Sequence, residues 1–107
     1  MERRNHPRKR GTHPVFYSSY ILHSKLRVAS TLDLSMEGVG IETLYGLQKG
    51  QGLNIYIVIG QKVIKCRGHV VHIEWPVGDR LKARVKFEEV AKDDTRYLSE
   101  YISSANG

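Results

Sequence analysis

The sequence has 107 residues and a net charge of +6, and its hydrophobic and charged fractions, 40% and 26%, are those of an ordinary globular domain. This length supports one domain with a single core. No run of about 18 apolar residues is present, which excludes a membrane-spanning helix. No apolar stretch follows the basic N-terminus, which excludes a secretory signal. The single cysteine, Cys66, excludes an internal disulfide. We therefore expect a cytoplasmic protein.

Most of the net charge lies at the start of the chain. Five basic side chains and one acidic side chain give residues 1–10 a charge of +4, whereas the rest of the chain carries only +2. Such a cluster attracts phosphates on nucleic acids, membranes or small nucleotides, although a solvated tail fits the charge equally well. Pro7 and Pro14 disfavour a helix. We predict a flexible arginine-rich arm over residues 1–13 and a folded domain over residues 14–107.

The first half of the domain has the pattern of short strands. Val15–Leu22 and Leu26–Leu34 are rich in β-branched and aromatic residues, with a short connection between them. Gly38–Thr43 is apolar at alternate positions, and the glycines of Leu47–Gly52 predict a loop. Leu53–Ile59 alternates strictly, which predicts a strand with one buried face.

The second half continues with two strands and then changes period. Val63–Trp75 is long enough to be bent, and Gly68 is a candidate bulge. In Arg80–Glu88 apolar side chains alternate with charged ones, which favours a strand whose basic face is solvated. A helix is predicted near residues 92–103, with the stripe Leu98, Tyr101 and Ile102 against the sheet.

These elements predict the fold class. Six short strands with tight turns, followed by one helix, indicate an all-β fold with a terminal helix. The expected architecture is a small six-stranded antiparallel β-barrel plus one C-terminal α-helix, because closure of the sheet removes its exposed edges.

One polar motif stands at the end of the second predicted strand. Asp33 and Ser35, two residues apart, would point to the same face. A carboxylate and a hydroxyl so placed can bind the donor-rich edge of a base such as guanine. Gly38 would let the backbone turn sharply or adopt a positive φ. By themselves these residues are equally typical of an ordinary turn.

A second motif lies in the arm. Arg4 and Arg8 form an Arg-x-x-x-Arg pattern, and arginine suits phosphate because its planar group donates paired hydrogen bonds and stacks on bases. The same spacing recurs at Arg80 and Arg84, so the spacing alone is weak evidence.

The order of the two motifs is more specific than either motif. Arg4-x-x-x-Arg8 precedes the first strand, and Asp33-x-Ser35-x-x-Gly38 follows the second. In this the chain resembles the PilZ domain family, whose members bind cyclic di-GMP with an arginine motif and an Asp/Asn-x-Ser-x-x-Gly motif in that order. The resemblance extends over nearly the whole chain.

The resemblance implies a receptor and adaptor, not an enzyme. It implies no cofactor, the ligand cyclic di-GMP and an effector protein as partner. Arginines of the arm would hold the phosphates and stack on the guanines, and the strand-end motif would bind a guanine edge. The implied ligand-binding residues are Arg4, Arg8, Asp33, Ser35 and Gly38, with Arg3 as a secondary candidate.

Other site chemistries have little support in the sequence. His69 and His72 are three apart on a predicted strand, so we expect them on opposite faces, unable to chelate a metal together. Cys66 is interpreted as a small buried apolar residue. No arrangement of Ser, His and Asp typical of catalysis is legible.

Two alternative functions stay open. Tyrosines and Trp75 could stack on single-stranded nucleic acid, as in other small basic barrels, but most of the net charge lies in the arm. The basic strand face of Arg80–Glu88 is adjoined by Glu88 and Glu89, so it is interpreted as solvated barrel exterior. The second alternative is a PilZ module that binds a protein without a nucleotide. The arginine motif argues against it, since PilZ modules of that type usually lack the motif.

Overall fold

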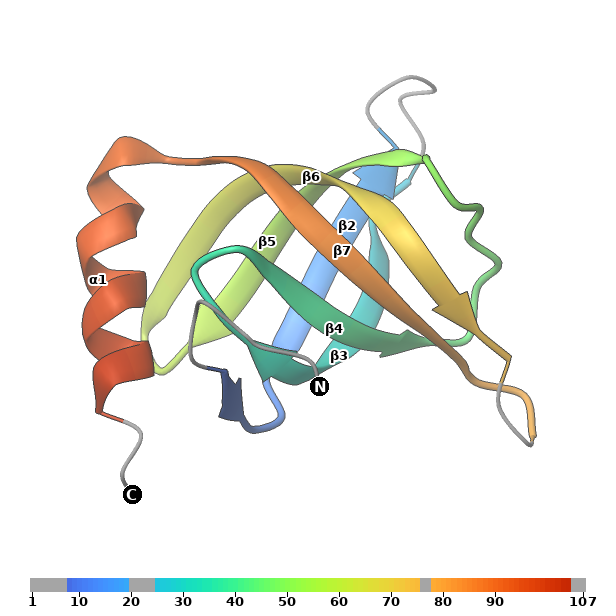
Figure 1. Ribbon diagram of the computed structural model, residues 1–107, viewed down its shortest axis with the longest axis horizontal. Coiled ribbons are helices and arrows are strands. Elements are labelled where there is room, and N and C mark those ends of the chain that lie inside the picture. Colours follow the sequence, from blue (N-terminus) through green and yellow to red (C-terminus); the bar gives the residue numbers. More distant parts are fainter. Residues whose placement is uncertain (1–7, 20–24, 76–77, 105–107) are drawn as a thin grey trace, which may run out of the picture.

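The computed structural model describes residues 8–19, 25–75 and 78–104, and seven strands and one helix follow one another in this part of the chain (Figure 1). The strands are β1 (Lys9–Arg10), β2 (Pro14–Ser19), β3 (Arg27–Leu34), β4 (Gly38–Thr43), β5 (Gly52–Ile59), β6 (Lys62–Glu74) and β7 (Leu81–Val90), and the helix is α1 (Lys92–Ser103).

Six of the strands form a closed antiparallel barrel. They follow one another in the order β3-β2-β5-β6-β7-β4, and β4 pairs in turn with β3, which closes the sheet. The predicted six-stranded barrel with a C-terminal helix is therefore confirmed. The short strand β1 was not predicted. It pairs with the end of β3, where Lys9 faces Leu34 and Arg10 faces Asp33.

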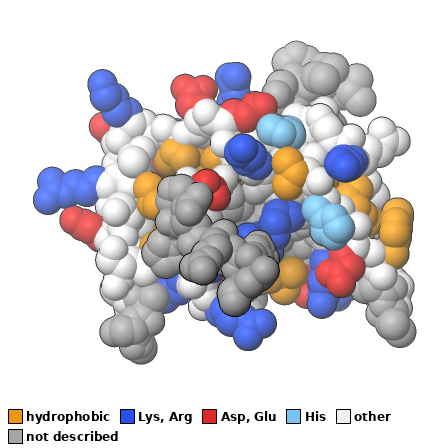
Figure 2. All heavy atoms as spheres, in the orientation of Figure 1, with side chains coloured by type: hydrophobic (Ala, Val, Ile, Leu, Met, Phe, Trp, Pro, Cys, Tyr) orange, Lys and Arg blue, Asp and Glu red, His pale blue; other side chains and the backbone are white. Residues whose placement is uncertain are grey.

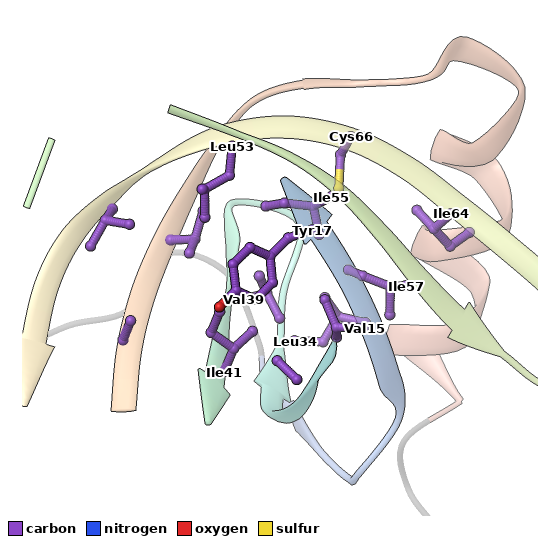
Figure 3. Close-up of a cluster of buried hydrophobic side chains, with 14 of the residues drawn as sticks. Val15, Tyr17, Leu34, Val39, Ile41, Leu53, Ile55, Ile57, Ile64 and Cys66 are labelled. Carbon is purple, nitrogen blue, oxygen red and sulfur yellow. The ribbon is translucent and has the colours of Figure 1, made fainter. Parts of the chain in front are cut away.

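The core fills the inside of the barrel (Figure 3). Alternate residues of each strand point inward, so the strict alternation of β5 places three isoleucines and a leucine in the core. Tyr17 is also buried, and its hydroxyl forms a hydrogen bond of 2.9 Å with that of Thr43. The buried polar group is thus satisfied inside an apolar core.

Strand β6 contains two irregularities that matter for its outer face. The register with β7 shifts at Gly68, which confirms the predicted bulge, and shifts again between Val70 and His72. Because of the second shift, His69 faces Lys86 and His72 faces Arg84, both on the outer face of β7. The prediction that the two histidines lie on opposite faces is wrong, since it assumed strict alternation.

Helix α1 lies across one end of the barrel (Figure 1). Leu98 and Ile102 are buried and Tyr101 packs against the core, which confirms the predicted stripe. Asp94 is buried in the first turn and does not cap the helix. Its carboxylate accepts a hydrogen bond of 2.8 Å from the backbone amide of Lys65. Among the described residues, no helix combines the length and apolar character needed to cross a membrane.

Asp94 also lies 3.2 Å from Nζ of Lys62, so one carboxylate joins α1 to β6 by two contacts. We expect Asp94→Ala to lower the free energy of unfolding by about 2 kcal/mol, because the amide of Lys65 loses its charged acceptor. Asp93→Ala is the matched control, since Asp93 is exposed in the same turn and should cost less than about 1 kcal/mol. Urea unfolding measures both variants. Equal losses would show that Asp94 acts only through the helix dipole.

Candidate functional site

Asp33 lies where three strands meet. It is near the end of β3, faces Arg10 of β1 on one side and pairs with Gly40 of β4 on the other. The register between β3 and β4 shifts between Thr31 and Asp33, which interrupts the alternation just before the carboxylate. The Asp33 side chain is 18% exposed, so it is partly shielded from water and still accessible.

Two arginines contact this carboxylate. Arg84 of β7 donates a fork of hydrogen bonds, from Nη1 to Oδ1 at 3.0 Å and from Nη2 to Oδ2 at 2.9 Å. Nη1 of Arg8 lies 3.9 Å from Oδ2, within ion-pair distance but too far for a hydrogen bond. A residue of the predicted arm and a residue of the barrel exterior therefore share one anionic partner.

The arginines determine the charge state of Asp33. Burial of the carboxyl raises its pKa, but hydrogen bonding and the positive charge of Arg84 outweigh this effect. The charge of Arg8 and a hydrogen bond from the Gly40 amide act in the same direction, so the pKa lies below its usual value. Asp33 is consequently a fixed carboxylate at neutral pH.

Ser35 shapes the loop that follows β3. Its Oγ accepts hydrogen bonds from the amides of Glu37, at 3.1 Å, and Gly38, at 3.2 Å. The amide of Ser35 donates to the carbonyl of Gly38 at 2.9 Å, which closes the loop. The hydroxyl is buried in these contacts and donates to the Gly38 carbonyl at 3.4 Å, so it would have to give up one of these partners to bind a base.

Gly38 is required by the close approach of a neighbouring strand. A Cβ at this position would lie 2.2 Å from the carbonyl oxygen of Val85 in β7. The positive φ considered for Gly38 from the sequence is wrong, because the glycines with positive φ in the described part of the chain are Gly50, Gly60 and Gly78. Glycine is needed here because the missing side chain lets β4 pack against β7, and not because the backbone makes a left-handed turn.

A shallow hollow of about 180 Å³ opens beside these residues. Figure 2 shows Lys, Arg and His side chains gathered over the face formed by β4, β6 and β7. The hollow therefore combines three cations, of which Lys86 is exposed and the two arginines are half-buried, with hydrogen-bonding groups and one carboxylate, that of Glu37. Its lining includes Arg8, Ser35, Gly38, Arg84 and Lys86.

The structure brings together part of the predicted site. Arg8, Ser35 and Gly38 line one hollow, and Arg8 also contacts Asp33. The predicted residues Arg3 and Arg4 lie outside the described residues. Sequence reasoning missed Arg84, which was interpreted as a solvated exterior residue. Only the pairing of Arg84 with Gly40 across β4 and β7 would have revealed its place beside the carboxylate.

His69 lies beside a carboxylate, and Cys66 is buried. Nδ1 of His69 is 2.9 Å from Oε2 of Glu88, and no group of three or more His, Cys, Asp or Glu side chains that could hold a metal ion occurs among the described residues. Cys66 is buried, and burial together with the charge of Asp94 raises its pKa to about 12.

The raised pKa of Cys66 makes a testable prediction. The thiol stays neutral at about pH 8, where an ordinary cysteine with a pKa near 8.5 is partly thiolate, so we expect no labelling by iodoacetamide in the native protein. Denaturation in urea at the same pH should restore full labelling within minutes. Mass spectrometry of both samples measures the effect, and rapid labelling of the native protein would contradict the burial of Cys66.

Comparison with known proteins identifies the family. A sequence profile of the PilZ domain matches residues 2–104. The chain belongs to the PilZ domain family. A comparison with curated proteins gave no match.

Several solved structures share this fold at low sequence identity. The Bacillus subtilis inhibitor of motility MotI/DgrA superposes with a TM-score of 0.82 and 18% identity, over 96% of this chain and 51% of that chain. This PilZ domain thus spans about half the length of that protein. The PilZ domain of YcgR from Escherichia coli, solved with c-di-GMP, gives a TM-score of 0.77 and 18% identity, over 97% of this chain and 92% of that chain.

A third neighbour is MrkH of K. pneumonia in its complex with c-di-GMP. It superposes with a TM-score of 0.76 and 16% identity, over 96% of this chain and 51% of that chain. At such identities the likeness establishes the barrel and its helix. The site residues of this PilZ domain have to be argued from its own geometry.

Proposed function

We propose that this PilZ domain is a receptor for cyclic di-GMP. The observation that carries the proposal is the contact between Arg8 and Asp33, which joins the arginine motif to the strand-end motif beside one basic hollow. Membership of the PilZ family and the two neighbours solved with c-di-GMP support the same ligand.

Each part of the ligand has a chemically matched group in this proposal. Arg8 and Arg4 hold the phosphates and stack on the guanines, with Arg3 in support. Asp33, kept as a carboxylate, accepts the N–H donors of a guanine edge. Ser35 and Gly38 hold the loop that frames the base. None of these roles requires bond making or breaking, so the domain acts as a receptor and not as an enzyme.

Contacts between the N-terminal segment and α1 support an adaptor role. Nζ of Lys9, the residue after Arg8, lies 4.2 Å from the centroid of the Tyr101 ring. Nε2 of His13 forms a hydrogen bond of 2.6 Å with the Tyr101 hydroxyl. A ligand that moves Arg8 would therefore shift Lys9 and change its contact with Tyr101 of α1. An effector protein could detect this change at the surface of the helix.

Isothermal titration calorimetry tests the proposal. We expect cyclic di-GMP to bind with low micromolar affinity or better, and GTP at the same concentration to give no comparable heat. Absence of binding by cyclic di-GMP would refute the receptor function. A gel shift with single-stranded DNA and RNA tests the nucleic-acid alternative, for which we expect only weak binding that disappears as salt is raised. Tight, salt-resistant binding would favour that alternative.

A further inference from the structure

The ion pair between Arg84 and Asp33 spans three strands. Arg84 of β7 pairs with Gly40 of β4, and Gly40 pairs with Asp33 of β3, so the arginine side chain must pass over β4 to reach the carboxylate. The pair is partly shielded, with exposed fractions of 33% for the Arg84 side chain and 18% for that of Asp33. It is the main contact of this carboxylate in the described part of the chain.

Gly40 leaves the space through which this pair forms. A Cβ at Gly40 would lie 3.1 Å from Nη2 of Arg84 and 3.2 Å from Oδ1 of Asp33, tighter than ordinary van der Waals contact. The Gly40 amide also donates a hydrogen bond to the carboxylate. Backbone and side chain thus hold Asp33 from two directions.

The acceptor capacity of Asp33 limits what else it can bind. A carboxylate offers about four lone-pair positions. Arg84 takes one on each oxygen, as an end-on fork. The Watson–Crick edge of guanine presents two parallel N–H donors, at N1 and N2, which need both oxygens on the same edge of the carboxylate. That edge is the one the Arg84 fork occupies.

We infer that Arg84 and guanine bind the same edge of Asp33 in turn, so that Arg84 is an internal competitor that the ligand has to displace. This inference rests on the proposed function, because it concerns the base of cyclic di-GMP. It makes Arg84 a specificity-determining residue. Adenine presents a donor beside an acceptor, so it cannot replace a fork of two donors, whereas guanine can.

The first test follows the affinity of variants that keep the charge. Arg84→Lys retains the positive charge beside the phosphates but loses the planar fork. We expect this variant to bind cyclic di-GMP about fivefold more tightly than the wild-type protein, which corresponds to about 1 kcal/mol. Arg80→Lys is the matched control, since Arg80 is exposed near the start of the same strand, and its affinity should not change. Equal or weaker binding by Arg84→Lys would overturn the inference.

The second test observes the exchange directly. Nitrogen-15 NMR of the guanidinium groups should show protected Nη–H signals for Arg84 in the free protein, assigned by their absence in Arg84→Lys. Saturation with cyclic di-GMP should remove this protection, while cyclic di-AMP should leave it unchanged. If cyclic di-GMP binds and the signals persist, the competition is refuted and the receptor function stands. If no variant binds the ligand, both proposals fail.

Discussion

Replacing Gly38 by alanine is expected to lower the free energy of unfolding by about 2–3 kcal/mol, because an overlap with backbone atoms of the neighbouring strand forces the two strands to shift. The new Cβ would lie 2.2 Å from the Val85 carbonyl oxygen and 3.3 Å from Cα of Lys86. Both are backbone atoms, so relief requires β4 to move away from β7. Thermal unfolding should show a fall in Tm of roughly 10–20 °C for a domain of this size.

Gly46→Ala is the control for this prediction. No atom lies within 4 Å of a Cβ built on Gly46, and its φ is not positive, so the change should stay within about 0.5 kcal/mol. Similar losses in both variants would mean that the loss does not come from contact with β7, since an effect of alanine on the unfolded chain would stabilise both variants. An unchanged Tm for Gly38→Ala would contradict the close approach of the two strands.

Asp33→Ala is expected to weaken the binding of cyclic di-GMP at least about tenfold, or about 1.4 kcal/mol. The variant removes the acceptor for the guanine edge and leaves Arg84 without its carboxylate partner. Arg8→Ala should cost a similar factor through the lost phosphate contact. Calorimetry measures both, with Asp79→Ala as the control, because Asp79 is exposed in a turn and should bind as the wild type does.

The pH dependence gives an independent check on Asp33. Its pKa is lowered in the folded protein, so the ion-pair stabilisation is present above the unfolded pKa of about 3.9 and is lost as pH falls through the lower folded value. Affinity should therefore stay constant between about pH 7 and pH 5. A decline within this range, absent from Asp33→Ala, would show that the carboxyl is not held in its charged form.

Most of the fold follows from local pattern. The alternation of Leu53–Ile59 and Arg80–Glu88 predicted β5 and β7, and the change of period after Val90 predicted α1. Strand β1 was not predicted, because two basic residues show no hydrophobic periodicity. Its pairing with β3 also depends on residues distant in sequence. The faces of His69 and His72 were predicted wrongly because only the first of two bulges in β6 is marked by a glycine, Gly68. The second, between Val70 and His72, has no such signal in the sequence.

The site was less predictable than the barrel. Local spacing placed Asp33 and Ser35 at a strand end, but not the burial of the Ser35 hydroxyl against its own loop. Arg84 looked like one cation among several on a polar face. Its role depends on the register of β4 against both β3 and β7, and no local pattern encodes a register between strands so far apart in sequence.

Closure of the barrel has a consequence for how the chain folds. Strand β4 gains its second neighbour only when β7 arrives, roughly forty residues later, and pairings between such distant segments are slow to form. Until then β4 is an exposed edge, and the hollow beside Asp33 does not exist, because Arg84 belongs to the strand that closes it. A ribosome making this protein must release most of β7 before the sheet can close, so a stall ahead of Leu81 would leave an aggregation-prone open sheet.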